Sequence, residues 1–408
     1  MTSVTVISLL KVARKRTMKS SSGQPVTYLI RVKVAHSPPN CLCVIQMSVA
    51  NTTSSNEEEQ LKKQAEKYVQ DWVYNNYTEH YDISDYKVQI TDFDKKGNTV
   101  TVGLLTTMGT TLKYKNVDTL PYMQGMKSVL GVASIEQFME TPQKMQMKSL
   151  DQNAKQNLTK AQQQNVINVV TEQYEDAKEC LNVATPLSAD FVVKATVDNG
   201  KLTNIKMYDK IFDKLYPAEG MKSEKELKNE GARDLLNYTK SEESKVFVAS
   251  NNSRASRYNR IAARDYVLRY TSNGTNSCHC GRMPHGVNYS KWNNAKYPYE
   301  ARFCHSDCAD FVSQGLAAGG IPVNSGWNRN QSSWTMVRSL CNYLVNKGYA
   351  TTTNYANCVA GNIVNIGGHV IMVTLNDTVH HRFSAHTTDR LNQDFTNQSG
   401  YQYYKIIY

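Results

Sequence analysis

The residues that carry most protein chemistry are concentrated in the last two fifths of this chain, which constrains how the chain can be organised. Residues 255–408 hold seven of the nine histidines, six of the nine cysteines and three of the four tryptophans among 408 residues. At roughly 100–200 residues per domain, a chain of this length contains two or three domains. We therefore expect a chemically active C-terminal domain that follows a module of a different kind.

Positive charge is also unevenly distributed, within a formal net charge of +11. Residues 1–50 contain seven Lys and Arg and no acidic residue, whereas residues 255–408 contain 14 Lys and Arg against seven Asp and Glu. Such charge favours anionic partners, for example wall polymers. No recognisable nucleic-acid docking motif accompanies it, so we expect no nucleic-acid partner. No run approaches the ~18 apolar residues of a membrane span, and we expect none.

Residues 1–50 have the pattern of a leader. Basic residues precede the apolar stretch CLCVIQMSVA, and Ser48-Val49-Ala50 has the small–x–small form that signal peptidase recognises. The pattern predicts a signal peptide and an extracellular or cell-wall-associated protein. Because Gln46 interrupts the apolar stretch, a disordered tail or a mistaken start codon is the alternative.

The segment 51–240 shows helix and hairpin patterns without catalytic spacing. Apolar residues recur at helical spacing over 55–78, and residues 86–105 alternate around a Lys-Lys-Gly-Asn turn as a β-hairpin does. A second hairpin is predicted over 189–212, across Asn199-Gly200. We expect an α+β spacer or binding module in which a helix packs on an antiparallel sheet. The other predicted parts are a mostly helical 142–185, a helix and linker over 216–254, and a domain linker at 241–254.

A helix that begins at a cysteine is predicted in the C-terminal domain, within DCADFVSQGLAAGGIP (307–322). Cys308 and Phe311 share its apolar face, and the helix is expected to stop at Gly319-Gly320. Unpaired backbone N–H groups and the helix dipole can lower a thiol pKa from about 8.5 to ~3.5–7.5. Cys308 is therefore a candidate nucleophile, with a buried small side chain as the alternative. Asp307 is expected to cap the helix through its carboxylate.

A strand hairpin farther along the chain supplies a candidate base. His369 opens the apolar strand HVIMV, a turn is predicted at Asn376-Asp377, and a second strand ends near His386. A thiol nucleophile needs an imidazole that accepts its proton and a third polar group that orients the ring. His386 is the first candidate for the orienting group, and Asp389 and Asn376 are weaker ones.

The ordered motifs of this segment resemble a known family. The motifs are DCADFVSQGLAAGGIP, Trp327 with Trp334-Thr335, GGHVIMVT and SAHTTDRLN. Together they are similar to an amidase domain of bacterial secreted proteins, a relative of the CHAP and NlpC-type cysteine amidohydrolases, and the resemblance covers about 255–408.

The resemblance implies a papain-like α+β domain with Cys308 as nucleophile, His369 as general base and His386 in the third position. Backbone N–H groups at the helix start would then hold the oxyanion. Related enzymes cleave amide bonds in peptidoglycan stem peptides or cross-bridges, which implies a wall peptide as substrate. No metal or organic cofactor is implied, and we expect a monomer.

The cysteine-rich segment that precedes the helix allows alternative roles for its cysteines. Cys278-His279-Cys280 and Cys304-His305, together with Cys308, could form a tetrahedral zinc site, which would make the chain a metal-dependent binding module. In an exported protein disulfides are favoured, with six cysteines available: Cys180, Cys278, Cys280, Cys304, Cys341 and Cys358. A wall-binding module or an acyl-transfer enzyme on the same fold is a further possibility.

Two smaller expectations concern packing. Four aromatic residues either line a cleft or pack in the core: Tyr297, Tyr299, Trp327 and Trp334. Asp389 and Arg390 are expected to form an ion pair that holds the end of the hairpin.

Overall fold

The computed structural model describes residues 17–19, 25–27, 52–140, 159–209, 214–215, 221–240, 257–273, 291–303, 306–387 and 389–408. Helices combine with a large, mostly antiparallel sheet, so the predicted α+β fold class is confirmed. Of the predicted leader, only β1 (Thr17–Lys19) and β2 (Pro25–Thr27) are described, as a short antiparallel pair. The signal-peptidase motif and the linker at 241–254 lie outside the described residues. Among those that are described, no helix has the length and apolar character needed to cross a bilayer.

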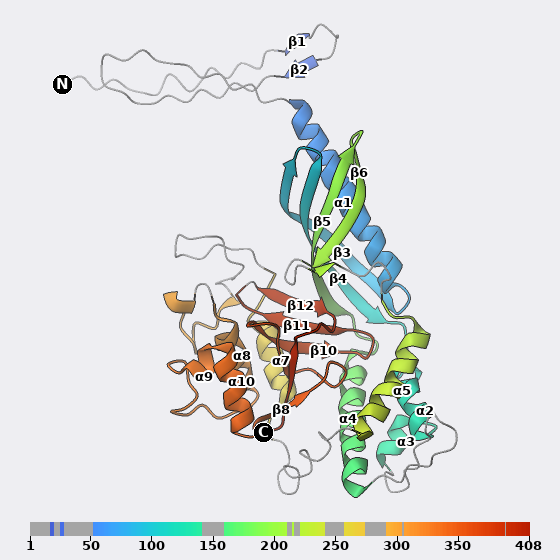
Figure 1. The fold of residues 1–408 in the computed structure, drawn as a ribbon, viewed down its shortest axis with the longest axis vertical. Coiled ribbons are helices and arrows are strands. Elements are labelled where there is room, and N and C mark those ends of the chain that lie inside the picture. Colours follow the sequence, from blue (N-terminus) through green and yellow to red (C-terminus); the bar gives the residue numbers. More distant parts are fainter. Residues whose placement is uncertain are drawn as a thin grey trace, which may run out of the picture.

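The long helix α1 (Thr52–Tyr77) confirms the helix predicted over 55–78. Ion pairs one turn apart stabilise its exposed side, such as that between Lys67 and Asp71. The helix lies along the sheet formed by β3–β6 (Figure 1). Its apolar residues recur every four positions and are fully buried: Leu61, Ala65, Val69 and Val73.

Both predicted N-terminal hairpins are confirmed. The first consists of β3 (Tyr81–Lys96) and β4 (Thr99–Leu112), and the second of β5 (Thr185–Asp198) and β6 (Lys201–Asp209). The turn residues Asn199 and Gly200 have φ angles of 48° and 75°, which Asn and Gly adopt more readily than other residues. Because β4 also pairs with β5, the two hairpins form one sheet.

A group of helices covers the lower end of this sheet (Figure 1). Gly125 and Gly231 allow α2 and α5 to cross closely, since a Cβ atom at either glycine would lie 2.0 Å from a carbonyl oxygen of the other helix. The described helices here are α2 (Pro121–Leu130), α3 (Ile135–Glu140), α4 (Lys160–Cys180) and α5 (Glu224–Lys240).

The C-terminal domain packs its helices against an antiparallel sheet (Figure 1). The helix predicted after Asp307 is confirmed as α8 (Cys308–Ala318), and the hairpin predicted after His369 as β10 (Val370–Asn376) and β11 (His381–Ala385). The other helices are α7 (Arg260–Arg269), α9 (Ser332–Thr335) and α10 (Val337–Asn346). The other strands are β8 (Ala350–Thr353), β9 (Ile363–Asn365), β12 (Arg390–Phe395) and β13 (Gln402–Ile406).

One sheet runs through both halves of the chain. In the described residues its order is β3-β4-β5-β12-β11-β10-β9-β13-β8. Strand β6 branches from β5, and the short β7 (Lys214–Leu215) pairs with β6. The halves meet where β12 pairs in parallel with β5 at Gln393 and Ser188. Across the same junction Arg390 binds the carboxylate of Asp190 at 2.5 Å. The N-terminal strands therefore extend the sheet that carries the candidate site.

Two packing expectations can now be compared with the structure. Trp327 and Trp334 have no exposed surface, and their rings lie 4.5 Å apart in the core, so they pack and do not line a cleft. The expected Asp389–Arg390 ion pair is wrong. The guanidinium of Arg390 bonds the backbone carbonyl of Asp389 and pairs with Asp190, because β5 brings that carboxylate beside the buried arginine.

Candidate active site

Cys308 is the first residue of α8, and its thiol is buried and free of any disulfide. Burial raises the pKa of this thiol, although the polar backbone groups of Val370 and Ala309 near the sulfur act in the opposite direction. The lowering predicted from the helix start is therefore wrong. Desolvation of a thiolate outweighs the favourable helix end, so the resting residue is a neutral thiol.

Thr387 lies against the start of the helix. Its hydroxyl oxygen accepts hydrogen bonds from the backbone N–H groups of Asp307 and Cys308, each at 3.2 Å. Thr387 has a φ angle of 85°, an uncommon conformation for a β-branched residue, so the surrounding contacts hold it there. The Cys308 N–H, expected to face an oxyanion, is occupied by this hydroxyl.

Asp307 occupies the N-cap position of α8, but its side chain makes no capping hydrogen bond. The expected carboxylate cap is therefore wrong. One oxygen of Asp307 instead lies 2.7 Å from Nδ1 of His386, and the other accepts from the Thr387 hydroxyl at 3.3 Å. An ion pair with an imidazolium satisfies this fully buried carboxylate better than a single backbone N–H would.

His386 is held as a buried cation. Nδ1 donates to Asp307, Nε2 donates to the carbonyl of Tyr270 at 2.8 Å, and the ring stacks on Phe311 with centroids 3.6 Å apart. Burial lowers the pKa of His386, but the carboxylates of Asp307 and Asp389 outweigh it and raise the pKa to about 9. With both nitrogens protonated and donating, His386 has no lone pair that could accept a proton.

His369 has the opposite protonation state. It lies directly before β10, after Gly367 and Gly368, whose positive φ angles make the turn from β9. Burial lowers its pKa to about 4, although the Asp307 carboxylate raises it in part. Its ring makes no hydrogen bond to any other described residue, so a lone pair remains available at neutral pH.

The structure thus brings together most of the predicted residues. Asp307, Cys308 and His386 form one hydrogen-bonded cluster with Thr387. His369 directly precedes Val370, which shares a buried core with Cys308. Asp389 also belongs to the surroundings, with one carboxylate oxygen 4.0 Å from Nε2 of His386.

Asn376 does not belong to the cluster. It lies at the far end of β10, where its amide donates to the carbonyl of Ala356.

A buried network behind the cysteine carries residues that the sequence patterns do not single out. Asp310, in the first turn of α8, accepts hydrogen bonds from Arg329 at 3.1 and 3.2 Å and from the Trp334 indole at 2.6 Å. One sequence feature could have identified Asp310: it is an acidic residue next to the apolar face of a predicted helix. An acidic side chain that becomes buried there needs a hydrogen-bonding or charged partner. This network fixes the first turn of α8.

Metal and disulfide alternatives depend mainly on segments outside the described residues, which include Cys278, Cys280, Cys304 and the neighbouring histidines. Among the described residues, no group of three or more His, Cys, Asp or Glu could hold a metal ion. The expected pairing of six cysteines is wrong in part. Cys180, Cys341 and Cys358 are buried free thiols.

Comparison with known proteins gives a family for this part of the chain. Residues 257–408 match the model of the family described as "Putative amidase domain". The match confirms the resemblance drawn from the ordered motifs and indicates hydrolysis of amide bonds. No curated protein and no solved structure matches the chain.

Proposed function

We propose, from the match of residues 257–408 to this amidase family, that the C-terminal domain is a cysteine amidohydrolase of the papain-like, CHAP and NlpC type. Cys308 would be the nucleophile and His369 the general base. The observation that carries the proposal is the packing of α8 against β10 in one buried core, which includes both Cys308 and Val370. It brings the start of β10, where His369 lies, to the first turn of α8.

The choice of His369 over His386 as base follows from their protonation states. A general base needs a lone pair within reach of the nucleophile. His386 is protonated on both nitrogens at neutral pH, whereas His369 is neutral and its ring is unbonded in the described part of the chain. His369 alone of the two can accept the thiol proton.

In the proposed reaction, His369 removes the Cys308 proton as the sulfur attacks the substrate carbonyl carbon. The tetrahedral intermediate collapses when the C–N bond breaks and the leaving amine takes the proton from His369. His369 then removes a proton from water as the water attacks the thioester. When the C–S bond breaks, the sulfur takes that proton back from His369, which releases the acid and restores the free thiol. Since the resting thiol and imidazole are both neutral, proton transfer accompanies attack and does not precede it.

His386 is assigned a positioning role. The positive charge of His386 pairs with the Asp307 carboxylate and fixes its position. Asp307 in turn raises the pKa of His369, against the lowering that burial causes. His386 would thus occupy the family's third polar position, acting on His369 through Asp307.

A peptide amide of cell-wall peptidoglycan is the proposed substrate, and the proposed location is extracellular or at the cell wall. The support is the family resemblance, the basic leader and the formal net charge of +11, since a basic protein associates with anionic wall polymers.

The test is hydrolysis of peptidoglycan stem and cross-bridge peptides by the full chain, with new amines and acids followed by mass spectrometry. We expect Cys308→Ala and His369→Asn to abolish cleavage. Cys341→Ala, at another buried free thiol, is the matched control and should retain it. Full activity in Cys308→Ala would refute the cysteine mechanism. Inactive wild type on every wall peptide would refute the proposed substrate.

A further inference from the structure

Thr387 follows the end of β11, and its hydroxyl group uses its full hydrogen-bonding capacity. The oxygen accepts from the backbone N–H groups of Asp307 and Cys308, each at 3.2 Å, and the hydroxyl donates to Oδ1 of Asp307 at 3.3 Å. A hydroxyl group has two acceptor lone pairs and one donor. All three contacts are with the start of α8, about 80 positions earlier in the chain.

The backbone of Thr387 is held in a conformation that a β-branched residue rarely adopts, with a φ angle of 85°. Such a conformation persists only where the surrounding contacts hold it, and these conformations are concentrated at functional sites. The contacts described for this side chain are those with Asp307 and Cys308. We therefore examined what the hydroxyl does for these two residues.

Two partners compete for the Asp307 carboxylate. Asp307 lies at the N-cap of α8, where backbone N–H groups and the helix dipole attract a carboxylate. The side chain makes no capping bond, and Oδ2 lies 2.7 Å from Nδ1 of His386. The Thr387 hydroxyl favours this second arrangement, because it holds Oδ1 and itself accepts from the N–H groups of Asp307 and Cys308.

The charge on His386 depends on where this carboxylate lies. Asp307 contacts the ring directly, whereas the other carboxylate that faces it, that of Asp389, is 4.0 Å from Nε2. The remaining groups around the ring are uncharged: the backbone carbonyl of Tyr270 and the aromatic rings of Phe311 and Trp292. Movement of Asp307 would therefore remove the closest negative charge from His386.

We propose that Thr387 is a positioning residue of the amidase site, whose hydroxyl keeps the Asp307 carboxylate on His386 and away from the start of α8. The inference rests on the amidohydrolase function proposed above and assigns it a residue that acts through Asp307, without contact with the substrate. Without the hydroxyl, the carboxylate turns toward the helix and leaves the histidine.

The first test is an NMR titration of the full chain with isotope-labelled histidine, in which the His386 signal is identified by its absence from His386→Gln. The wild-type pKa of this ring is raised to about 9. In Thr387→Val, which keeps the shape of the side chain and removes the hydroxyl, we expect the pKa to fall by about one unit or more, because a carboxylate leaves the imidazolium. This measurement needs no substrate.

The second test is the kinetics of wall-peptide cleavage. Thr387→Val should lower kcat about tenfold and change KM less than about twofold, because the variant disturbs the arrangement of the reacting groups and not substrate binding. Thr387→Ala should behave as Thr387→Val does. Thr387→Ser restores the hydroxyl and should recover most of the lost kcat together with the His386 titration.

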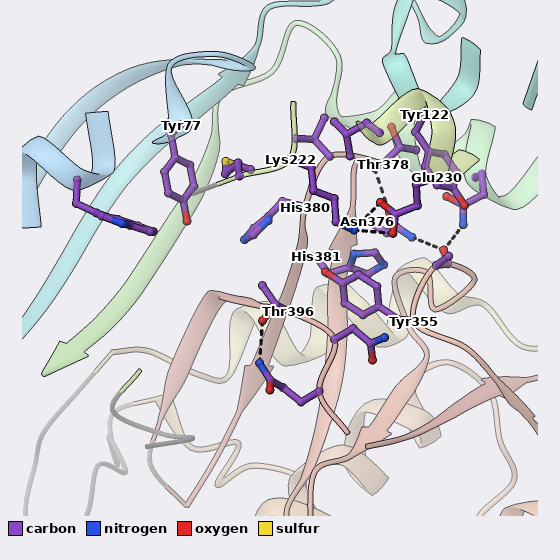
Figure 2. A pocket seen from close by; sticks show the side chains of 18 residues that line it. Tyr77, Tyr122, Lys222, Glu230, Tyr355, Asn376, Thr378, His380, His381 and Thr396 are labelled. Atoms are coloured by element: carbon purple, nitrogen blue, oxygen red, sulfur yellow. Dashed lines mark hydrogen bonds and ion pairs between the residues drawn. The ribbon is translucent and has the colours of Figure 1, made fainter. Parts of the chain in front are cut away.

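Thr378→Val is the matched control. Thr378 is also buried and also has a positive φ angle, 69°, but it lies at the tip of the β10–β11 hairpin, in the wall of a separate cavity of about 460 Å³ (Figure 2). Its hydroxyl makes no hydrogen bond to another described residue. This variant should leave both the His386 titration and the cleavage kinetics unchanged.

Three results would overturn the proposal. They are an unchanged His386 titration in both hydroxyl-free variants, an equal effect of Thr387→Ser and Thr387→Val, and unfolding of both hydroxyl-free variants, which would assign Thr387 to the fold alone. If the wild type cleaves no wall peptide but the titration shifts as expected, the amidase proposal fails and the effect of Thr387 on Asp307 stands. If cleavage requires Cys308 but Thr387→Val titrates as wild type does, only the role of Thr387 is refuted.

Discussion

The buried His386–Asp307 pair makes the stability of the C-terminal domain depend on pH in a predictable direction. The folded-state pKa of His386 is raised to about 9, against an ordinary value of about 6.5. At ~1.36 kcal/mol per pKa unit, the difference corresponds to about 3 kcal/mol. A histidine whose pKa is higher in the folded state stabilises the fold fully when the pH is below its pKa in the unfolded state. This stabilisation disappears as the pH rises through its pKa in the folded state. The window is therefore between about pH 6.5 and pH 9.

Urea unfolding followed by tryptophan fluorescence provides the measurement. Trp292 lies 5.5 Å from the His386 ring, between ring centroids, and two further tryptophans lie in the same domain. We expect the free energy of unfolding to fall by about 3 kcal/mol on account of His386 between about pH 6 and pH 9.5. Histidines with lowered pKa values, such as His369, destabilise the fold only below about pH 6.5, so they do not contribute in this window.

The variant His386→Gln isolates the effect, because cysteine thiols also titrate at the upper end of the range. It removes the titrating ring and leaves the other ionisable groups in place. The stability difference between wild type and His386→Gln should shrink by about 3 kcal/mol as the pH rises through the window. If that difference stays constant within about 1 kcal/mol, His386 is not a buried cation and the assignment of its nitrogens is wrong.

Three other measurements test separate parts of the structure. Cys308 should react with iodoacetamide at pH 7 more slowly than a cysteine in an unfolded peptide, because burial raises its pKa; equal rates in mass spectrometry would contradict a buried neutral thiol. If His369 is the base, amide hydrolysis should persist down to about pH 5 and decline as the pH falls through about 4, where the ring becomes protonated. A loss of activity near pH 6.5 instead would contradict the lowered pKa of this histidine. Gly231→Ala should destabilise the fold by about 1–3 kcal/mol in urea unfolding, because its Cβ would lie 2.0 Å from the Tyr122 carbonyl oxygen. Gly326→Ala, with no contact closer than 3.4 Å, is its control and should change stability little.

Elements with a clear local pattern could be predicted from the sequence. The helices α1 and α8 show apolar residues at helical spacing, and the β5–β6 turn carries Asn199-Gly200, so each is specified by neighbouring residues. Local signals for α2 were also present, since Pro121 begins it and Gly131 ends it in a left-handed conformation.

Strand β12 could not be predicted in this way. Its sequence, RLNQDF, is polar, yet most of its residues are buried. It lies in the middle of the sheet, between β11 and β5, and Arg390 is compensated by Asp190 from a strand 200 positions away. Polar residues in a buried strand are stable only when distant partners satisfy them, and no local pattern reports those partners.

For the candidate site, the sequence by itself determined that a cysteine begins an apolar helix and that a histidine precedes an apolar strand, because both depend on local periodicity. Only the tertiary structure decided the protonation states. It buried the thiol deeply enough to reverse the effect of the helix start, and it brought Asp307 against His386, 79 residues away, leaving His369 as the neutral ring. Charge in a protein interior depends on solvent exclusion and on neighbours distant in sequence, and both exist only once the chain has folded.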